Sequence, residues 1–132
     1  MQNTRKQLIV RKDDYEIIMN YLKQGLGRNN FNRKDVEDLE TELRRAKLVN
    51  KEELPGDIVR LNSIVTIKDE KEAKPLQVTV VTPDKSDIKQ RKISIMSPIG
   101  TALIGFKKGE KVSWKVPAGK KTFTIVDVIN RF

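Results

Sequence analysis

The spacing of apolar residues changes abruptly at residues 54–57, and this change limits the chain to an α+β fold. Before this Leu-Pro-Gly-Asp stretch, apolar residues recur three and four positions apart, which is typical of amphipathic helices. After it they alternate with polar residues, as in half-buried strands. Adjacent proline and glycine end a helical pattern. We therefore predict a helical part, residues 1–53, followed by a sheet domain, residues 54–132.

Two amphipathic segments in the first part predict an antiparallel helical hairpin. The first begins near Asp13, whose side chain can cap it, and ends near Gln24. A link at residues 23–32 contains two glycines and three asparagines, which favour a turn. The second segment has the spacing of a coiled-coil seam, so we expect a short coiled coil. The apolar residues of this seam are Val36, Leu39, Leu43 and Ala46.

The second part contains a series of alternating segments, which predict a small antiparallel sheet. The first segment runs from Val59 to Lys68, and the last, near residues 122–129, changes parity at Val126, which predicts a β-bulge. One short helix interrupts the sheet, because Ser97 is a good N-cap and Pro98 suits the first helical position. We expect Gly100 to allow close backbone approach and Gly105 to end this helix.

The composition argues against most enzymes. The chain has no cysteine and no histidine, so a thiol nucleophile, a zinc cluster and the commonest general base are excluded, and we expect no cofactor. The apolar run at residues 8–10 is too short to cross a membrane, so we expect a cytoplasmic protein. The net charge is +9, and residues 55–132 carry 15 basic and 8 acidic side chains, a balance of +7. This charge favours an acidic partner or nucleic acid.

A basic surface in the second part is a candidate for DNA or RNA binding. Its residues are Lys89, Arg91, Lys107 and Lys108. Nucleic-acid binding usually combines such charge with aromatic side chains, and only Phe106 is close in sequence. A basic DNA- or RNA-binding module is therefore the alternative function.

Several sequence stretches resemble the GreA/GreB family of bacterial transcription factors, most closely its short members. The resemblance covers roughly Asp13 to the C-terminus. It depends on five stretches: Glu-Leu-Arg-Arg-Ala at 42–46, Leu-Pro-Gly-Asp-Ile-Val at 54–59, Leu-Asn-Ser at 61–63, Val-Thr-Pro at 81–83, and Ser-Pro-Ile-Gly-Thr-Ala-Leu-Ile-Gly at 97–105.

The resemblance implies an FKBP-like C-terminal domain that docks on bacterial RNA polymerase at the secondary channel, with the coiled coil pointing inward. In Gre factors, acidic residues at the hairpin tip hold a magnesium ion for transcript cleavage, but residues 23–32 here contain no Asp or Glu. We therefore predict non-enzymatic docking without cleavage, in competition with Gre factors. The implied docking residues are Met96, Ser97, Pro98, Ile99 and Gly100. The hairpin tip would present Leu26, Arg28 and Phe31.

Overall fold

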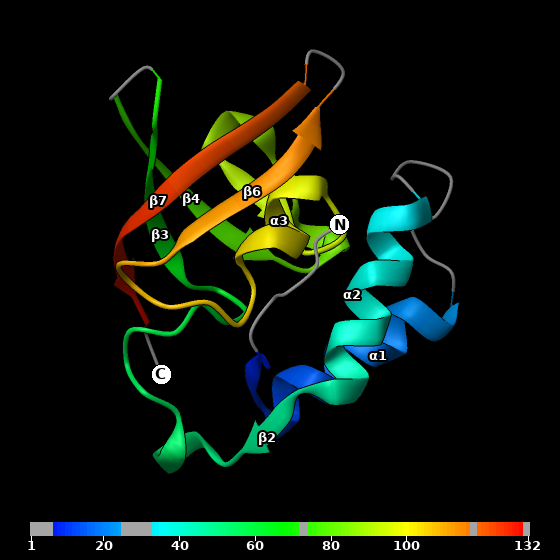
Figure 1. Cartoon of the computed structure of the whole chain (residues 1–132). Coiled ribbons are helices and arrows are strands. Elements are labelled where there is room, and N and C mark those ends of the chain that lie inside the picture. Colours follow the sequence, from blue (N-terminus) through cyan, green and yellow to red (C-terminus); the bar gives the residue numbers. More distant parts are fainter. Residues whose placement is uncertain (1–6, 25–32, 72–73, 117–118, 131–132) are drawn as a thin grey trace.

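The computed structural model describes residues 7–24, 33–71, 74–116 and 119–130, and it combines a five-stranded sheet with three α-helices in these ranges (Figure 1). This confirms the α+β class. The elements, in chain order, are β1 (Ile9–Arg11), α1 (Lys12–Gln24), α2 (Arg33–Arg45), β2 (Lys47–Val49), η1 (Lys51–Glu53), β3 (Ile64–Asp69), β4 (Pro75–Val81), η2 (Pro83–Lys85), η3 (Ile88–Gln90), β5 (Lys92–Ser94), α3 (Pro98–Leu103), β6 (Lys111–Val116) and β7 (Gly119–Ile129), where η denotes a 3-10 turn.

The sheet has the strand order β5-β4-β3-β7-β6, and it is not wholly antiparallel. Strands β3, β4, β6 and β7 pair antiparallel, whereas β5 pairs parallel to β4, with Val80 opposite Ile93. The prediction of a purely antiparallel sheet was therefore wrong at this edge. The physical reason is the crossover through η2 and η3, which brings the chain back beside Thr79 in the second half of β4 before β5 begins, so that both strands run in the same direction.

Strand β7 contains the predicted bulge. Ile67 of β3 pairs with Ile125, and Thr66 pairs with Asp127, so Val126 is the extra residue. Ile125 is fully buried, whereas Val126 is 42% exposed. The change of parity thus keeps Ile125 and Val128 in the core on either side of the bulge.

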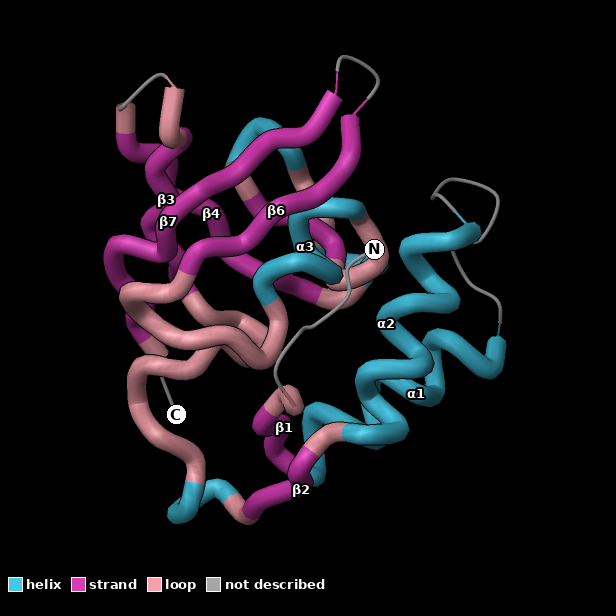
Figure 2. The backbone as a smooth tube through the Cα atoms, in the orientation of Figure 1, coloured by secondary structure: helices cyan, strands magenta, loops and turns pink. Residues whose placement is uncertain are grey.

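The helices share one hydrophobic core with the sheet. Helices α1 and α2 lie side by side (Figures 1 and 2). Ile18 and Leu22 of α1 and Leu39 and Leu43 of α2 are each at most 2% exposed. They belong to the same cluster as the inward residues of the sheet, such as Ile67. Burial of this shared apolar surface is what holds the helices against the sheet.

A two-stranded parallel sheet, β1 with β2, connects the ends of the helical part and was not predicted. The apolar run at residues 8–10, where this sheet starts, was interpreted from the sequence only as too short to cross a membrane. In the structure the amide of Lys47 donates to the carbonyl of Leu8 at 2.8 Å, and Leu8 is 2% exposed. None of the helices in the described ranges is long and apolar enough to cross a membrane.

One predicted helix cap and one predicted strand boundary were wrong. Helix α1 begins at Lys12, and the Asp13 carboxylate accepts hydrogen bonds from the Arg11 guanidinium and the Asp14 amide rather than capping the helix. Strand β3 begins at Ile64 instead of Val59. The alternation at 59–63 is interrupted because Asn62 adopts a left-handed φ of 72°, which turns the chain before the strand.

Candidate functional site

The start of α3 is built by the side chain of Ser97. Its Oγ accepts a hydrogen bond from the Gly100 amide at 3.1 Å and donates to the Ser94 carbonyl at 2.6 Å. Pro98 occupies the first helical position, where its missing N–H is not needed. The predicted cap is confirmed, and it ties the helix start to the end of β5.

Gly100 allows the first turn of α3 to lie directly on β5. A Cβ atom added at this position would lie 2.0 Å from the Ser94 carbonyl oxygen and 2.9 Å from the Ile95 Cα. Both neighbours are backbone atoms, so a side chain could not be accommodated by a rotamer change. This confirms that Gly100 serves close backbone approach. Gly105, with a φ of +84°, follows the helix as predicted.

The residues predicted for docking differ in their exposure. Met96 is 1% exposed and Gly100 is buried, so both lie under the surface of the segment and neither offers a side chain to a partner. Ser97 and Ile99 are partly exposed, and Ile99 also packs against the core. The side chain of Pro98 lies outside those described. Among the described side chains of residues 96–100, the exposed surface therefore comes from Ser97 and Ile99, and the Ser97 hydrogen bonds hold the backbone that carries it.

The other predicted site residues lie elsewhere. Leu26, Arg28 and Phe31 fall outside the described residues. Lys89 within η3 and Arg91 directly after it are exposed, just before the edge strand β5. Lys107 and Lys108 are exposed just before β6, the strand at the other edge of the sheet.

These two basic groups therefore belong to separate turns rather than to one element. Lys108 also lies 3.6 Å from the Asp127 carboxylate.

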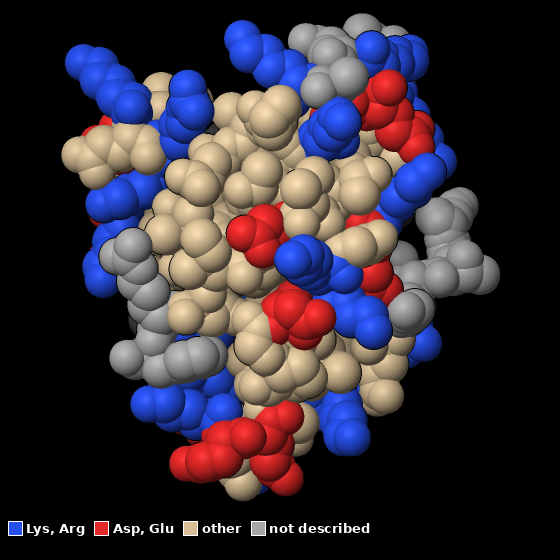
Figure 3. All heavy atoms as spheres, turned by 90° about the vertical axis from the view of Figure 1, so that its left-hand side faces the viewer, with Lys and Arg blue, Asp and Glu red and all other residues tan. Residues whose placement is uncertain are grey.

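Figure 3 shows the side of the molecule on which β3, β4 and β7 lie. Near its centre this face carries Asp and Glu together with Lys and Arg side chains, uncharged surface lies beside them, and further Lys and Arg side chains lie around the edge. This face does not present the continuous basic strip that follows a nucleic-acid backbone.

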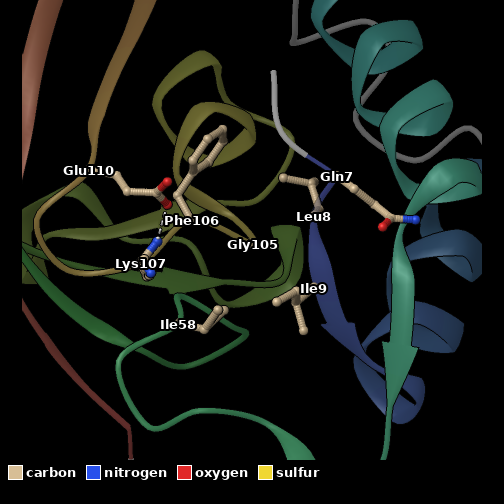
Figure 4. Close-up of a pocket in the computed structure, with 8 residues that line it drawn as sticks. All are labelled: Gln7, Leu8, Ile9, Ile58, Gly105, Phe106, Lys107 and Glu110. Carbon is tan, nitrogen blue, oxygen red and sulfur yellow. Dashed lines mark hydrogen bonds between the residues drawn. The ribbon is translucent and has the colours of Figure 1, made fainter. Parts of the chain in front are cut away.

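A small pocket lies between the N-terminal strand and the turn that precedes β6 (Figure 4). Its volume is about 100 Å³, and its lining includes Leu8, Ile58 and Phe106. At the rim, the Lys107 amide donates to the Glu110 carboxylate at 2.9 Å. Sites for small molecules usually enclose about 300–1,000 Å³. This pocket is therefore too small for a nucleotide or an organic cofactor.

A buried ion pair joins α1 to the segment before β3. The Arg60 Nε and Nη2 atoms each donate to one Asp14 carboxylate oxygen at 2.8 Å. Their side chains are only 11% and 2% exposed. Burial raises the pKa of the Asp14 carboxyl, and the hydrogen bonds from Arg60 oppose this shift. The pair is a structural tie, because paired charges are the usual form in which a carboxylate is buried.

Tyr21 of α1 makes a second contact across the same boundary. Its hydroxyl donates to the carboxylate of Asp84 in η2. This hydrogen bond raises the pKa of Tyr21 and lowers that of Asp84. Within the described ranges, no three acidic side chains converge to form a site that could hold a metal ion.

A model of one protein family matches the sheet domain together with the α3 segment. The match covers residues 54–130, and the family is described as "Transcription elongation factor, GreA/GreB, C-term". The chain belongs to the GreA/GreB family. The matched region begins at the Leu-Pro-Gly-Asp stretch and includes the Ser97 cap and Gly100.

Individual GreA/GreB proteins agree with this assignment. The transcription elongation factor GreA of Pelobacter propionicus is 39% identical over 93 residues, which are 70% of this chain and 59% of that protein. The regulator of nucleoside diphosphate kinase of Escherichia coli is 34% identical over 84 residues, 64% of this chain and 62% of that protein. The match thus spans about three fifths of each relative.

The fold is also that of a solved GreA/GreB structure. The prokaryotic transcription elongation factor GreA/GreB from Nitrosomonas europaea has a TM-score of 0.78 and 33% identity to this chain. The comparison covers 96% of this chain and 100% of that one, so it includes the helical part as well as the sheet.

Two features of this GreA/GreB chain were not found from its sequence. The Asp14–Arg60 pair joins residues 46 positions apart, and nothing in the sequence relates them. The other feature is Ile88, which is 88% exposed in η3. Its signal was available, because it is a lone apolar residue in a charged stretch and falls outside both alternating segments around it.

Proposed function

We propose that this chain is a non-enzymatic regulator of transcription that binds bacterial RNA polymerase through its sheet domain. Its docking residues would be Ser97, Pro98 and Ile99, held in place by Met96 and Gly100 from beneath. The secondary channel would be the docking location, and competition with Gre factors would follow. We infer further that α1 and α2 form the short coiled-coil hairpin and that the sheet domain is FKBP-like.

The observation that carries this proposal is that the family match includes the residues that shape the start of α3. Ser97 closes the first turn through two hydrogen bonds, and Gly100 lies against the β5 backbone. The segment is therefore preorganised, which reduces the entropy lost when it binds a partner. The net positive charge would add long-range attraction to an acidic polymerase surface.

Two features support docking without stimulation of transcript cleavage. The link between α1 and α2 contains no carboxylate in its sequence, so it offers none of the oxygen ligands that magnesium prefers. Each helix has 13 residues, which corresponds to a length of about 20 Å. Because the link offers no carboxylate for a metal ion, the two helices would act by occupying space at the secondary channel of the polymerase.

The test combines binding to purified core RNA polymerase with a cleavage assay on backtracked elongation complexes. We expect saturable binding of the wild-type chain and no acceleration of cleavage. Ile99→Asp should abolish binding, and Pro98→Ala should weaken it without loss of the fold. Urea denaturation of each variant serves as the control, because Ile99 also packs against the core. Lack of wild-type binding to polymerase would refute the proposal.

The same experiment addresses the alternative function. A basic DNA- or RNA-binding module would bind duplex or single-stranded nucleic acid without polymerase, with an affinity that falls steeply with salt. Because Lys89 and Arg91 precede one edge strand and Lys107 and Lys108 the other, we expect only weak binding of this kind.

A further inference from the structure

The turn before β5 presents an isoleucine almost completely to solvent. Ile88 is 88% exposed, well above the other exposed large apolar side chains of the described residues, which reach at most 42%. An exposed isoleucine contributes nothing to the core, and it increases the apolar surface that water must cover. Its position therefore needs a reason other than packing.

The backbone holds this isoleucine in a fixed position. Asp87 and Lys92 exchange two backbone hydrogen bonds of 2.9 Å, which close the six-residue loop 87–92. Inside the loop, the Asp87 carboxylate accepts from the Lys89 amide at 3.0 Å, and Arg91 adopts a left-handed φ of 57°. The Arg91 carbonyl accepts from the Thr79 amide of β4 at 2.9 Å. The loop is therefore anchored to the sheet.

Basic residues flank the exposed isoleucine in the sequence. Lys85, Lys89 and Arg91 are all exposed. Within the described residues none of the three forms an ion pair, whereas Asp84 accepts the Tyr21 hydroxyl and Asp87 caps the turn. Residues 84–92 thus combine one apolar projection with a net charge of +2, from four basic and two acidic side chains.

We propose that loop 87–92 is a second contact with the polymerase, in which Ile88 enters an apolar recess and Lys85, Lys89 and Arg91 face acidic side chains around it. This proposal rests on the proposed function, because it names the same partner. A small, rigid, apolar anchor with a charged rim is the usual composition of an energetically important protein contact. The loop lies outside residues 96–100 and adds an independent source of affinity.

Other occupants fit the loop less well. Binding of single-stranded nucleic acid relies on stacking of bases against aromatic rings, and residues 83–92 contain no aromatic residue. Stable attachment to a membrane needs more buried apolar surface than one isoleucine supplies. An acidic protein surface with an apolar recess would contact both the exposed isoleucine and the basic side chains of the loop.

The test measures the affinity of core RNA polymerase for the 132-residue chain with Ile88→Ser and for a matched control, Ile129→Ser. Ile129 is also exposed, at 42%, but it lies at the end of β7, a strand that does not neighbour β5 in the sheet. We expect Ile88→Ser to weaken binding roughly 10-fold, as follows from loss of one buried aliphatic side chain. The control should bind like the wild type. The urea midpoint of Ile88→Ser should not change.

A double variant, Lys89→Gln with Arg91→Gln, should slow association and reduce its salt dependence. Wild-type binding that Ile88→Ser leaves unchanged would overturn the loop contact and leave the proposed function intact. Lack of binding by the wild type would overturn both. Binding of duplex DNA or phosphatidylserine vesicles that Ile88→Ser weakens, with polymerase binding unchanged, would assign the loop to that occupant and overturn the proposal.

Discussion

Replacing Asp14 by asparagine should destabilise the protein by about 3 kcal/mol, at the lower end of the range for breaking a buried ion pair from one side. The Asp14 and Arg60 side chains are 2% and 11% exposed and are joined by two hydrogen bonds of 2.8 Å. Asparagine keeps one acceptor but no charge, so the Arg60 guanidinium would remain largely buried without its counterion. A typical domain is stable by about 5–15 kcal/mol, so this loss should be large.

The measurement is urea denaturation followed by far-UV circular dichroism at pH 7. The control is Glu40→Gln, which breaks the exposed pair between Glu40 and Arg44 and should change stability by less than about 0.5 kcal/mol. The double replacement Asp14→Leu with Arg60→Met removes both charges, and we expect it to recover most of the loss. A loss below about 1 kcal/mol for Asp14→Asn would refute the view that this pair ties the helices to the sheet.

Three further outcomes follow from the same contacts, each measured by urea denaturation. Gly100→Ala should cost about 3 kcal/mol, because its Cβ would lie 2.0 Å from the Ser94 carbonyl oxygen; a loss below about 1 kcal/mol would contradict the close approach. Ser97→Ala should cost about 1 kcal/mol, and Ser97→Thr should retain most of that stability because threonine can make both Ser97 bonds. Arg11 lowers the pKa of Asp13. The Asp13 carboxylate therefore stabilises the protein at pH values above the ordinary aspartate pKa of about 3.9, and this stabilisation is lost as the pH falls through the lower pKa that Asp13 has in the folded state. Asp13→Asn should therefore lower stability at pH 7, by at most about 1 kcal/mol since the side chain is 55% exposed, and the loss should become smaller as the pH falls below the ordinary aspartate range; equal losses at neutral and acidic pH would exclude this cause.

Local patterns predicted the parts of the fold that depend on short-range chemistry. The Ser97 cap and the close approach at Gly100 could be inferred because each follows from the residue type and its neighbours. The bulge at Val126 was predicted because a change of parity in a strand leaves one residue unpaired.

Long-range pairing could not be inferred in the same way. The parallel pairing of β5 with β4 depends on where the chain returns after η2 and η3, which alternation does not encode. The left-handed conformation of Asn62 interrupted a pattern that otherwise favoured a strand from Val59. The docking segment was inferred from family resemblance, whereas Ile88 was not singled out although it is a lone apolar residue in a charged stretch, and the structure shows it 88% exposed.

The shared core has a consequence for how a docked chain would act. Ile18 and Leu39 of the helices lie in the same cluster as Ile67 of the sheet, and the Asp14–Arg60 pair crosses the same boundary. A sheet domain held on the polymerase would therefore also fix the direction of α1 and α2. Weakening that boundary should alter occlusion of the channel more than affinity, because the residues proposed for docking all lie within residues 85–100, on the sheet side of it.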